Sequence, residues 1–205
     1  MKKLLLASTL LAVATAMTGP AMAGEEIKVG VLLGYTGPIE SLTPDMAASA
    51  ELAFDEASDS GLLLGGSKIV SVRADSTCVD SAAATAAGER LISSHGVVAI
   101  MGADCSGVTG AVANNVAIPN GVVMVSPSAT SPGLSLIKDN GFFFRTSPSD
   151  ARQGEVLAAV LKSRGITEVA ITYTNNDYGK GLSDSFESAF KAVGGKISIT
   201  AAHED

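Results

Sequence analysis

Small polar side chains follow the hydrophobic runs of this sequence, in positions where they could bind an anion. Ser106 comes shortly after the apolar run 97–101 and opens a segment with helical spacing. At the start of a helix, a serine can offer its hydroxyl and its backbone N–H to an anion, because the helix dipole is positive there. The same residue could instead be a plain N-cap that only stabilises the helix. The spacing leaves both interpretations open.

Two further stretches carry candidate binding residues. Ser128, Ala129 and Thr130 lie between two prolines, directly after the apolar run 122–125. They could form a polar shelf that faces a ligand, or only a rigid turn. Tyr178 stands at the start of a strongly amphipathic segment, where an aromatic residue could contact a ligand or anchor the loop.

Asp104 opposes the anion interpretation of this region. It precedes Ser106 by two residues, and a carboxylate beside an anion site repels the anion unless it is turned away.

The sequence lacks the enzymatic motifs that would make these residues catalytic. It holds neither a G-x-S-x-G elbow nor a G-x-x-x-x-G-K-[ST] loop. The two histidines and two cysteines are not at metal-ligand spacing. We expect no cofactor and no enzymatic activity. A hydrolase that uses Ser106 remains the alternative, although no base is placed beside it.

The composition excludes nucleic-acid binding proteins and largely disordered proteins. The 205 residues carry 14 Lys and Arg against 21 Asp and Glu, a net charge of −7. Nucleic-acid binding proteins need a basic surface, so a nucleic-acid partner is excluded. The 46% of hydrophobic residues excludes disorder for most of the chain.

The first 23 residues have the layout of a secretory signal peptide. Lys2 and Lys3 precede an apolar stretch, Gly19-Pro20 breaks it, and Ala21-Met22-Ala23 offers a cleavage site. The stretch is too short to span a membrane. We expect cleavage after Ala23 and a periplasmic protein. In that compartment Cys78 and Cys105 most simply form a disulfide, with a metal site or a catalytic thiol as alternatives.

Apolar runs and amphipathic segments alternate along the rest of the chain. This alternation predicts an α/β fold with doubly wound parallel sheets. Thr43 is expected to cap the first helix, with Pro44 at its first position. The predicted strands are 27–33, 69–74, 97–101, 122–125, 142–144, 169–173 and 196–200. Asp80 is expected to cap a second helix that runs to about Ser94. Further helices are predicted from Ser106 to Ile118, from Ser149 or Asp150 to Arg164, and from Tyr178 to Val193.

The ordered set of motifs resembles the type I periplasmic substrate-binding proteins of ABC transporters, the Leu/Ile/Val-binding class. The motifs are Ile27-Lys28-Val29-Gly30-Val31 with Thr36-Gly37-Pro38, the cysteine pair, Ser126 to Thr130, Phe144-Arg145-Thr146 with Ser149-Asp150 and Gln153-Gly154, and Asp177 to Gly181. Such proteins clamp a solute between two α/β lobes. The resemblance implies a first ligand-binding lobe over 24–145 and the start of a second, incomplete lobe over 146–205.

The resemblance also implies roles for individual residues. Ser106 would meet the carboxylate of an amino acid. Ser128 and Thr130, on either side of Ala129, would supply a carbonyl and a hydroxyl. Tyr178 would close over the ligand, and the acidic residue that meets the ammonium group is expected beyond residue 205.

Two departures from the family pattern bear on the identity of the ligand. Leu42 stands where several members have an aromatic wall, and Asp104 replaces an apolar residue. We therefore expect an amino acid, branched-chain or similar, that is delivered to an ABC transporter membrane permease. The alternatives are the same fold binding an amide, a urea-like compound or an aromatic acid, and a sensor ectodomain.

Overall fold

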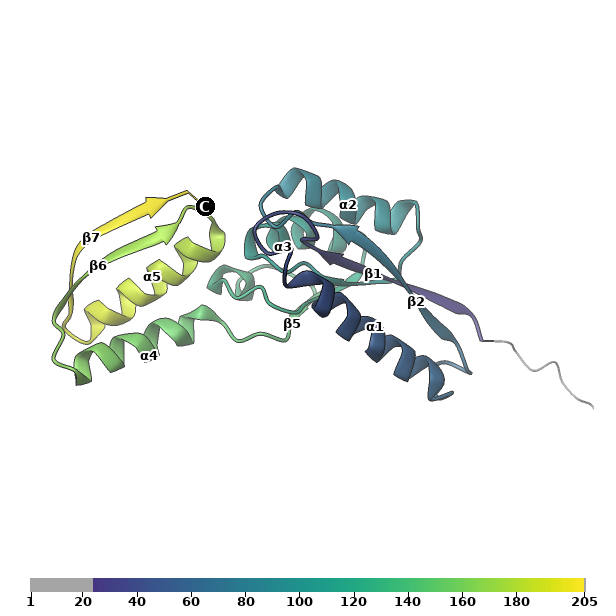
Figure 1. Ribbon diagram of the computed structural model, residues 1–205, viewed down its shortest axis with the longest axis horizontal. Helices are drawn as coiled ribbons and strands as arrows, with labels where there is room; N and C mark the ends of the chain where they lie inside the picture. The colour runs from purple at the N-terminus through teal and green to yellow at the C-terminus, as the bar shows by residue number, and fades with distance from the viewer. Residues whose placement is uncertain (1–23, 205) are drawn as a thin grey trace, which may run out of the picture.

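The computed structural model describes residues 24–204, which form two parallel β-sheets with helices packed against them (Figure 1). The signal peptide predicted over residues 1–23 lies outside the described residues.

The first sheet has five parallel strands in the order β2-β1-β3-β4-β5. The strands are β1 (Glu26–Leu33), β2 (Lys68–Asp75), β3 (Ala99–Gly102), β4 (Val123–Ser126) and β5 (Phe143–Arg145). The helical segments of this five-stranded unit are α1 (Thr43–Asp59), α2 (Ser81–Ser93), α3 (Ser106–Val112), the π-helical turn η1 (Ala113–Ala117) and the 3-10 turn η2 (Pro132–Ser135).

Helices cover the two faces of this sheet unequally. Leu32 of β1 belongs to the large core beneath α2 and α3, together with Ile100 and Met124. Its neighbours Val31 and Leu33 point the other way, into a smaller core against α1. Side chains that alternate between two apolar cores explain why β1 reads as a continuous apolar run.

The second sheet pairs β6 (Glu168–Thr174) with β7 (Lys196–His203) in parallel. With α4 (Asp150–Ser163) and α5 (Asp177–Ala192) it forms the two-stranded unit, which follows β5 in the chain. Its core contains Ala158, Ile171, Phe186 and Phe190, and the two phenylalanine rings stack 5.4 Å apart. Most side chains of β7 are exposed: Ile197 packs against this core, whereas Ile199 is exposed.

Two local predictions need correction. Leu42, not Thr43, is the N-cap residue of α1, and no side chain caps that helix. The buried Thr43 hydroxyl instead donates to the carbonyl of Gly34 at 3.0 Å, so it ties the start of α1 to the end of β1. The helix predicted from Ser106 to Ile118 changes at Ala113 from α-helical to π-helical geometry.

Candidate functional site

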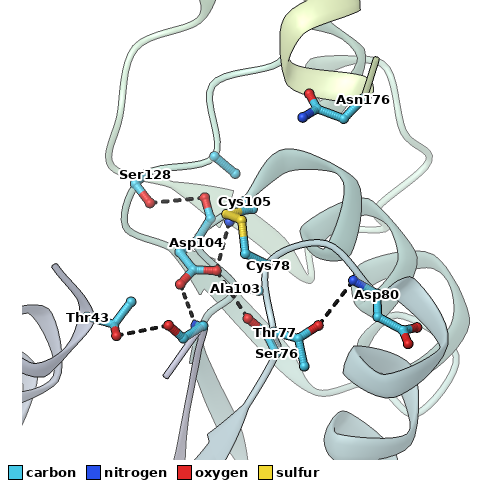
Figure 2. Close-up of a disulfide and its surroundings, with 12 residues drawn as sticks. Thr43, Ser76, Thr77, Cys78, Asp80, Ala103, Asp104, Cys105, Ser128 and Asn176 are labelled. Carbon is cyan, nitrogen blue, oxygen red and sulfur yellow. Dashed lines mark hydrogen bonds between the residues drawn. A yellow bond between two sulfur atoms is a disulfide. The ribbon is translucent and has the colours of Figure 1, made fainter. Parts of the chain in front are cut away.

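The loops that follow the first four strands of the five-stranded sheet meet at one residue, Asp104, which is 3% exposed. Its Oδ2 accepts a hydrogen bond from the backbone N–H of Gly34 at 2.6 Å. Its Oδ1 accepts from Ser76 Oγ at 3.1 Å and from the backbone N–H of Cys105 at 2.9 Å. The Asp104 carbonyl accepts from Ser128 Oγ at 3.0 Å (Figure 2). We call this set of hydrogen bonds the strand-tip network.

The strand-tip network explains how a carboxylate can be buried at this place. A buried charge is costly unless donors surround it, and the Asp104 carboxylate has three of them. The carboxylate is therefore turned into the framework of the strand tips, where it has a positioning role. A carboxylate that is turned away in this manner does not repel an anion bound beside Asp104, which is the condition stated above for an anion site in this region.

The predicted disulfide is present beside the network. Cys78, in the loop after β2, is bonded to Cys105, the residue before α3, with a Cα–Cα distance of 5.2 Å (Figure 2). The bond joins the ends of two strands that are not direct neighbours, because β1 lies between β2 and β3.

Ser106 is the first residue of α3, and the cap residue is Cys105. The interpretation of Ser106 as a plain N-cap is therefore wrong. Its buried hydroxyl oxygen accepts a hydrogen bond from the backbone N–H of Ser131 at 3.1 Å. The hydroxyl hydrogen remains for a second partner, since a serine hydroxyl both donates and accepts.

The loop from Ser128 to Ser131 is held mainly by side chains at and just after the end of β5. The Ala129 carbonyl accepts from Arg145 Nη1 at 3.2 Å and from Ser147 Oγ at 3.1 Å. Arg145 Nη1 also donates to the Ser131 carbonyl at 2.9 Å. Ala129 is 1% exposed, whereas the Ser128 side chain reaches the surface. Arg145 thus holds this loop, a role that sequence reasoning did not assign to it.

Thr130, Tyr178 and Leu42 occupy more open positions. Thr130 is half-buried and its carbonyl accepts from the backbone N–H of Asp150 at 3.0 Å, the first residue of α4. Tyr178, the second residue of α5, is 45% exposed, and Leu42 is 60% exposed. Both side chains remain accessible to a ligand.

A cavity of about 700 Å³ lies between the two units. The five-stranded unit contributes Ser106, Gly110 and Asn114 to its wall, and α5 contributes Asp177, Lys180 and Asp184. Ser106 is the predicted binding residue that lines this cavity. Ser128, Ala129, Thr130, Tyr178 and Leu42 are not among its lining residues.

Asp75 organises the loop that leads from β1 to α1. Its carboxylate accepts from the backbone N–H of Tyr35 at 3.0 Å, from Thr36 Oγ1 at 2.6 Å and from the backbone N–H of Thr77 at 2.8 Å. Burial raises the pKa of Asp75, but these hydrogen bonds outweigh it and leave the pKa below its usual value. Burial also raises the pKa of Tyr35 to about 12, against the opposing effect of Arg73.

Residues 24–204 contain no group of three or more His, Cys, Asp or Glu side chains that could hold a metal ion. No helix among them is both long and apolar enough to cross a bilayer.

Comparison with known proteins places this geometry in a family. The family model described as "Periplasmic binding protein" matches residues 26–204. The chain is 34% identical over 181 residues to the Leu/Ile/Val-binding protein homolog 3 of Brucella melitensis, covering 88% of this chain and 47% of the relative. It is 29% identical to the Leu/Ile/Val/Thr-binding protein of Salmonella typhimurium, covering 96% of this chain and 54% of the relative.

Solved structures of similar proteins support the same family. An ABC transporter substrate-binding protein of Desulfitobacterium hafniense in complex with Leu is 30% identical, with a TM-score of 0.71 over 88% of this chain and 52% of that protein. The substrate-binding protein LivJ of Streptococcus pneumoniae, in complex with isoleucine, is 28% identical with a TM-score of 0.73, over 88% of this chain and 50% of that one. The chain spans about half the length of the relatives it matches. With its two parallel α/β sheets and a family match over nearly all described residues, the chain belongs to the periplasmic binding protein family.

Proposed function

We propose that this chain binds an aliphatic amino acid of the leucine, isoleucine and valine type, and takes part in delivering it to an ABC transporter permease from the periplasm. The observation that carries the proposal is Ser106. Its buried hydroxyl is held by the Ser131 N–H and lines the cavity between the two units. Relatives named for binding Leu, Ile and Val support the same ligand class.

The proposed site uses the strand-tip loops as one jaw. Ser106 would donate its free hydroxyl hydrogen to the ligand carboxylate, near the positive start of the helical segment α3–η1. The Ser128 carbonyl and the Thr130 hydroxyl would meet the polar end of the ligand. The loop that carries them is fixed by Asp104 and Arg145, so little conformational freedom would be lost on binding.

The second jaw would be the two-stranded unit, with Tyr178 closing over the solute. This assigns the first lobe to residues 24–145 and the start of the second to residues 146–205, with a hinge near residues 145–148. Closure of two lobes about such a hinge is an established way of trapping a solute.

The rival ligand classes were suggested by Leu42 and Asp104. Because Asp104 is engaged in the strand-tip network, it gives no reason to expect an amide or an aromatic acid. Leu42 is exposed and stands where several family members have an aromatic wall, so amides and aromatic acids are included in the test below.

Scanning calorimetry with a panel of solutes tests the proposal. Leucine, isoleucine and valine should raise the unfolding temperature, because a ligand that binds only the folded state stabilises it. A rise with benzoate or urea-like compounds, and none with amino acids, would establish the alternative. No rise with any of these solutes would contradict both.

A further inference from the structure

The two units touch where α5 meets η2 and α3, and Gly181 lies at the first of these contacts. A Cβ atom built on Gly181 would lie 2.8 Å from Ser131 Oγ and 3.0 Å from Pro132 Cδ. Both distances are shorter than ordinary van der Waals contact. The contact therefore depends on the absence of a side chain at position 181. Figure 1 shows α5 with its N-terminal end toward the five-stranded unit.

The backbone beneath Gly181 is firmly held, although the Ser131 hydroxyl itself can rotate. The backbone of Ser131 is held on both sides: its N–H donates to Ser106 Oγ at 3.1 Å, and its carbonyl accepts from Arg145 Nη1 at 2.9 Å. Pro132 has a ring that fixes its own backbone torsion. Rotation of the Ser131 hydroxyl can relieve part of the clash of a methyl group, but a larger side chain also meets the Pro132 ring and would displace α5.

The two-stranded unit would move as one body in response. At Gly154 of α4, an added Cβ would lie 2.8 Å from the backbone nitrogen of Phe186 in α5, so these helices are in close contact. Gly179 packs against the Thr174 carbonyl at the end of β6. Since α5 is fixed to both α4 and β6, its displacement would be transmitted to the linkage that follows β5.

We propose that Gly181 is a positioning residue that sets how closely the two units approach each other. The inference rests on the proposed function for its effect on affinity, since a solute held between the units binds best when they come fully together. A larger residue at position 181 would hold the units apart and weaken binding. Because Gly181 also lines the cavity, weaker binding alone could come from a smaller cavity, so the distance between the units is what tests the positioning role. Its effect on the distance between the units does not depend on which solute is bound.

Two substitutions at this position test the proposal, each with a matched control two helical turns further along α5. Gly181→Ala and Gly181→Val are compared with Ser188→Ala and Ser188→Val, at an exposed position of the same helix. Alanine favours a helix more than glycine does, so a loss of binding in Gly181→Ala cannot be assigned to a weaker helix. Circular dichroism checks that each variant is folded.

Two measurements are made on each protein. The first is the distance between spin labels at positions 62 and 162, attached through a ketone-bearing amino acid so that the disulfide stays intact. The second is the affinity for leucine. Gly181→Val should lengthen the distance and weaken leucine binding by roughly tenfold or more. Gly181→Ala should do the same to a smaller degree, and the Ser188 variants should match the wild type.

The outcomes separate this inference from the proposed function. An unchanged label distance in a folded Gly181→Val protein would overturn the positioning role. A lengthened distance with unchanged leucine affinity would overturn the effect of that role on binding. If wild-type protein bound no leucine, the proposed function would fail. The label distance alone would then decide whether Gly181 sets the approach. If Gly181→Val did not fold, Gly181→Ala would give the same decision.

Discussion

The backbone N–H of Gly34 donates to the carboxylate of Asp104 across 2.6 Å, and this hydrogen bond joins the ends of two neighbouring parallel strands. Gly34 follows β1 and Asp104 follows β3, so residues 70 positions apart in sequence are fixed at one edge of the sheet. The same edge carries Ser106 and Ser128, and its rigidity is the physical basis of the proposed site.

Replacing Asp104 by asparagine should destabilise the protein strongly. The amide keeps one acceptor oxygen, but its NH₂ group would face a donor, so at least one buried donor loses its partner. A lost hydrogen bond to a buried charged group costs about 2–3 kcal/mol of unfolding free energy. Urea unfolding measures this loss. Asp55→Asn, at an exposed position of α1, serves as control and should change stability by no more than about 0.5 kcal/mol. Equal stability of the two variants would show that the network has no such role.

Removal of the disulfide should lower the free energy of unfolding, because the unfolded chain gains conformational entropy when the cross-link is absent. Cys78 and Cys105 are separated by 27 positions, and the chain-entropy model gives about 3.5 kcal/mol for closing a loop of this size. The double variant Cys78→Ser, Cys105→Ser should therefore unfold at lower urea concentration. Wild-type protein in reductant should approach the variant, and the variant itself should not respond to reductant. A reductant response in the variant would mean that the effect lies elsewhere.

Ser106→Ala should weaken amino-acid binding more than it weakens the fold. A hydrogen bond to a charged ligand group contributes about 1.5–3 kcal/mol, which corresponds to roughly a tenfold to hundredfold rise in Kd. Ser106→Thr keeps the hydroxyl and should retain most of the affinity. Ser94→Ala, at the exposed end of α2, is the control for a serine outside the site. The proposed role of Ser106 is wrong if the Ser106→Ala and Ser106→Thr variants bind leucine equally well.

Asp75 should make stability depend on pH in the acid range. Its pKa is lowered in the folded protein, whereas the unfolded value lies near about 3.9. A lowered folded pKa gives stability that is present above the unfolded value and is lost as pH falls through the folded value. Asp75→Asn should therefore be less stable than wild type at neutral pH, and the difference should shrink below about pH 4. Urea unfolding at several pH values measures it, and a constant difference would refute this assignment.

The sequence predicted the order of strands and helices because each has a local signal. Asp80 was recognised as a cap, and its carboxylate does accept from the N–H groups of Ala82 and Ala83. Thr43 was misassigned because a Thr-Pro pair fits a cap, whereas its hydroxyl is used by the distant Gly34 carbonyl. No local pattern could reveal that tertiary partner.

The candidate site was predictable only in part, for the same reason. Ser106 could be selected from its place after a strand, and Cys78 and Cys105 from the compartment. The contacts of Asp104 and Arg145 could not, since each joins loops that are distant in sequence. The Gly181 contact depends on how the two units meet, and single-sequence periodicity holds no information on that.

The central claim is that the strand-tip loops bind an aliphatic amino acid, and a titration followed by NMR tests it most directly. Leucine is added to ¹⁵N-labelled protein, with lysine and glutamate as controls, up to millimolar concentration, so that even weak binding is detected. The account predicts that leucine shifts the backbone amide signals of Ser106, Ser128 to Thr130 and Tyr178 together, with one common Kd. Absence of leucine-dependent shifts at these amides, or shifts confined to other parts of the protein, would contradict it.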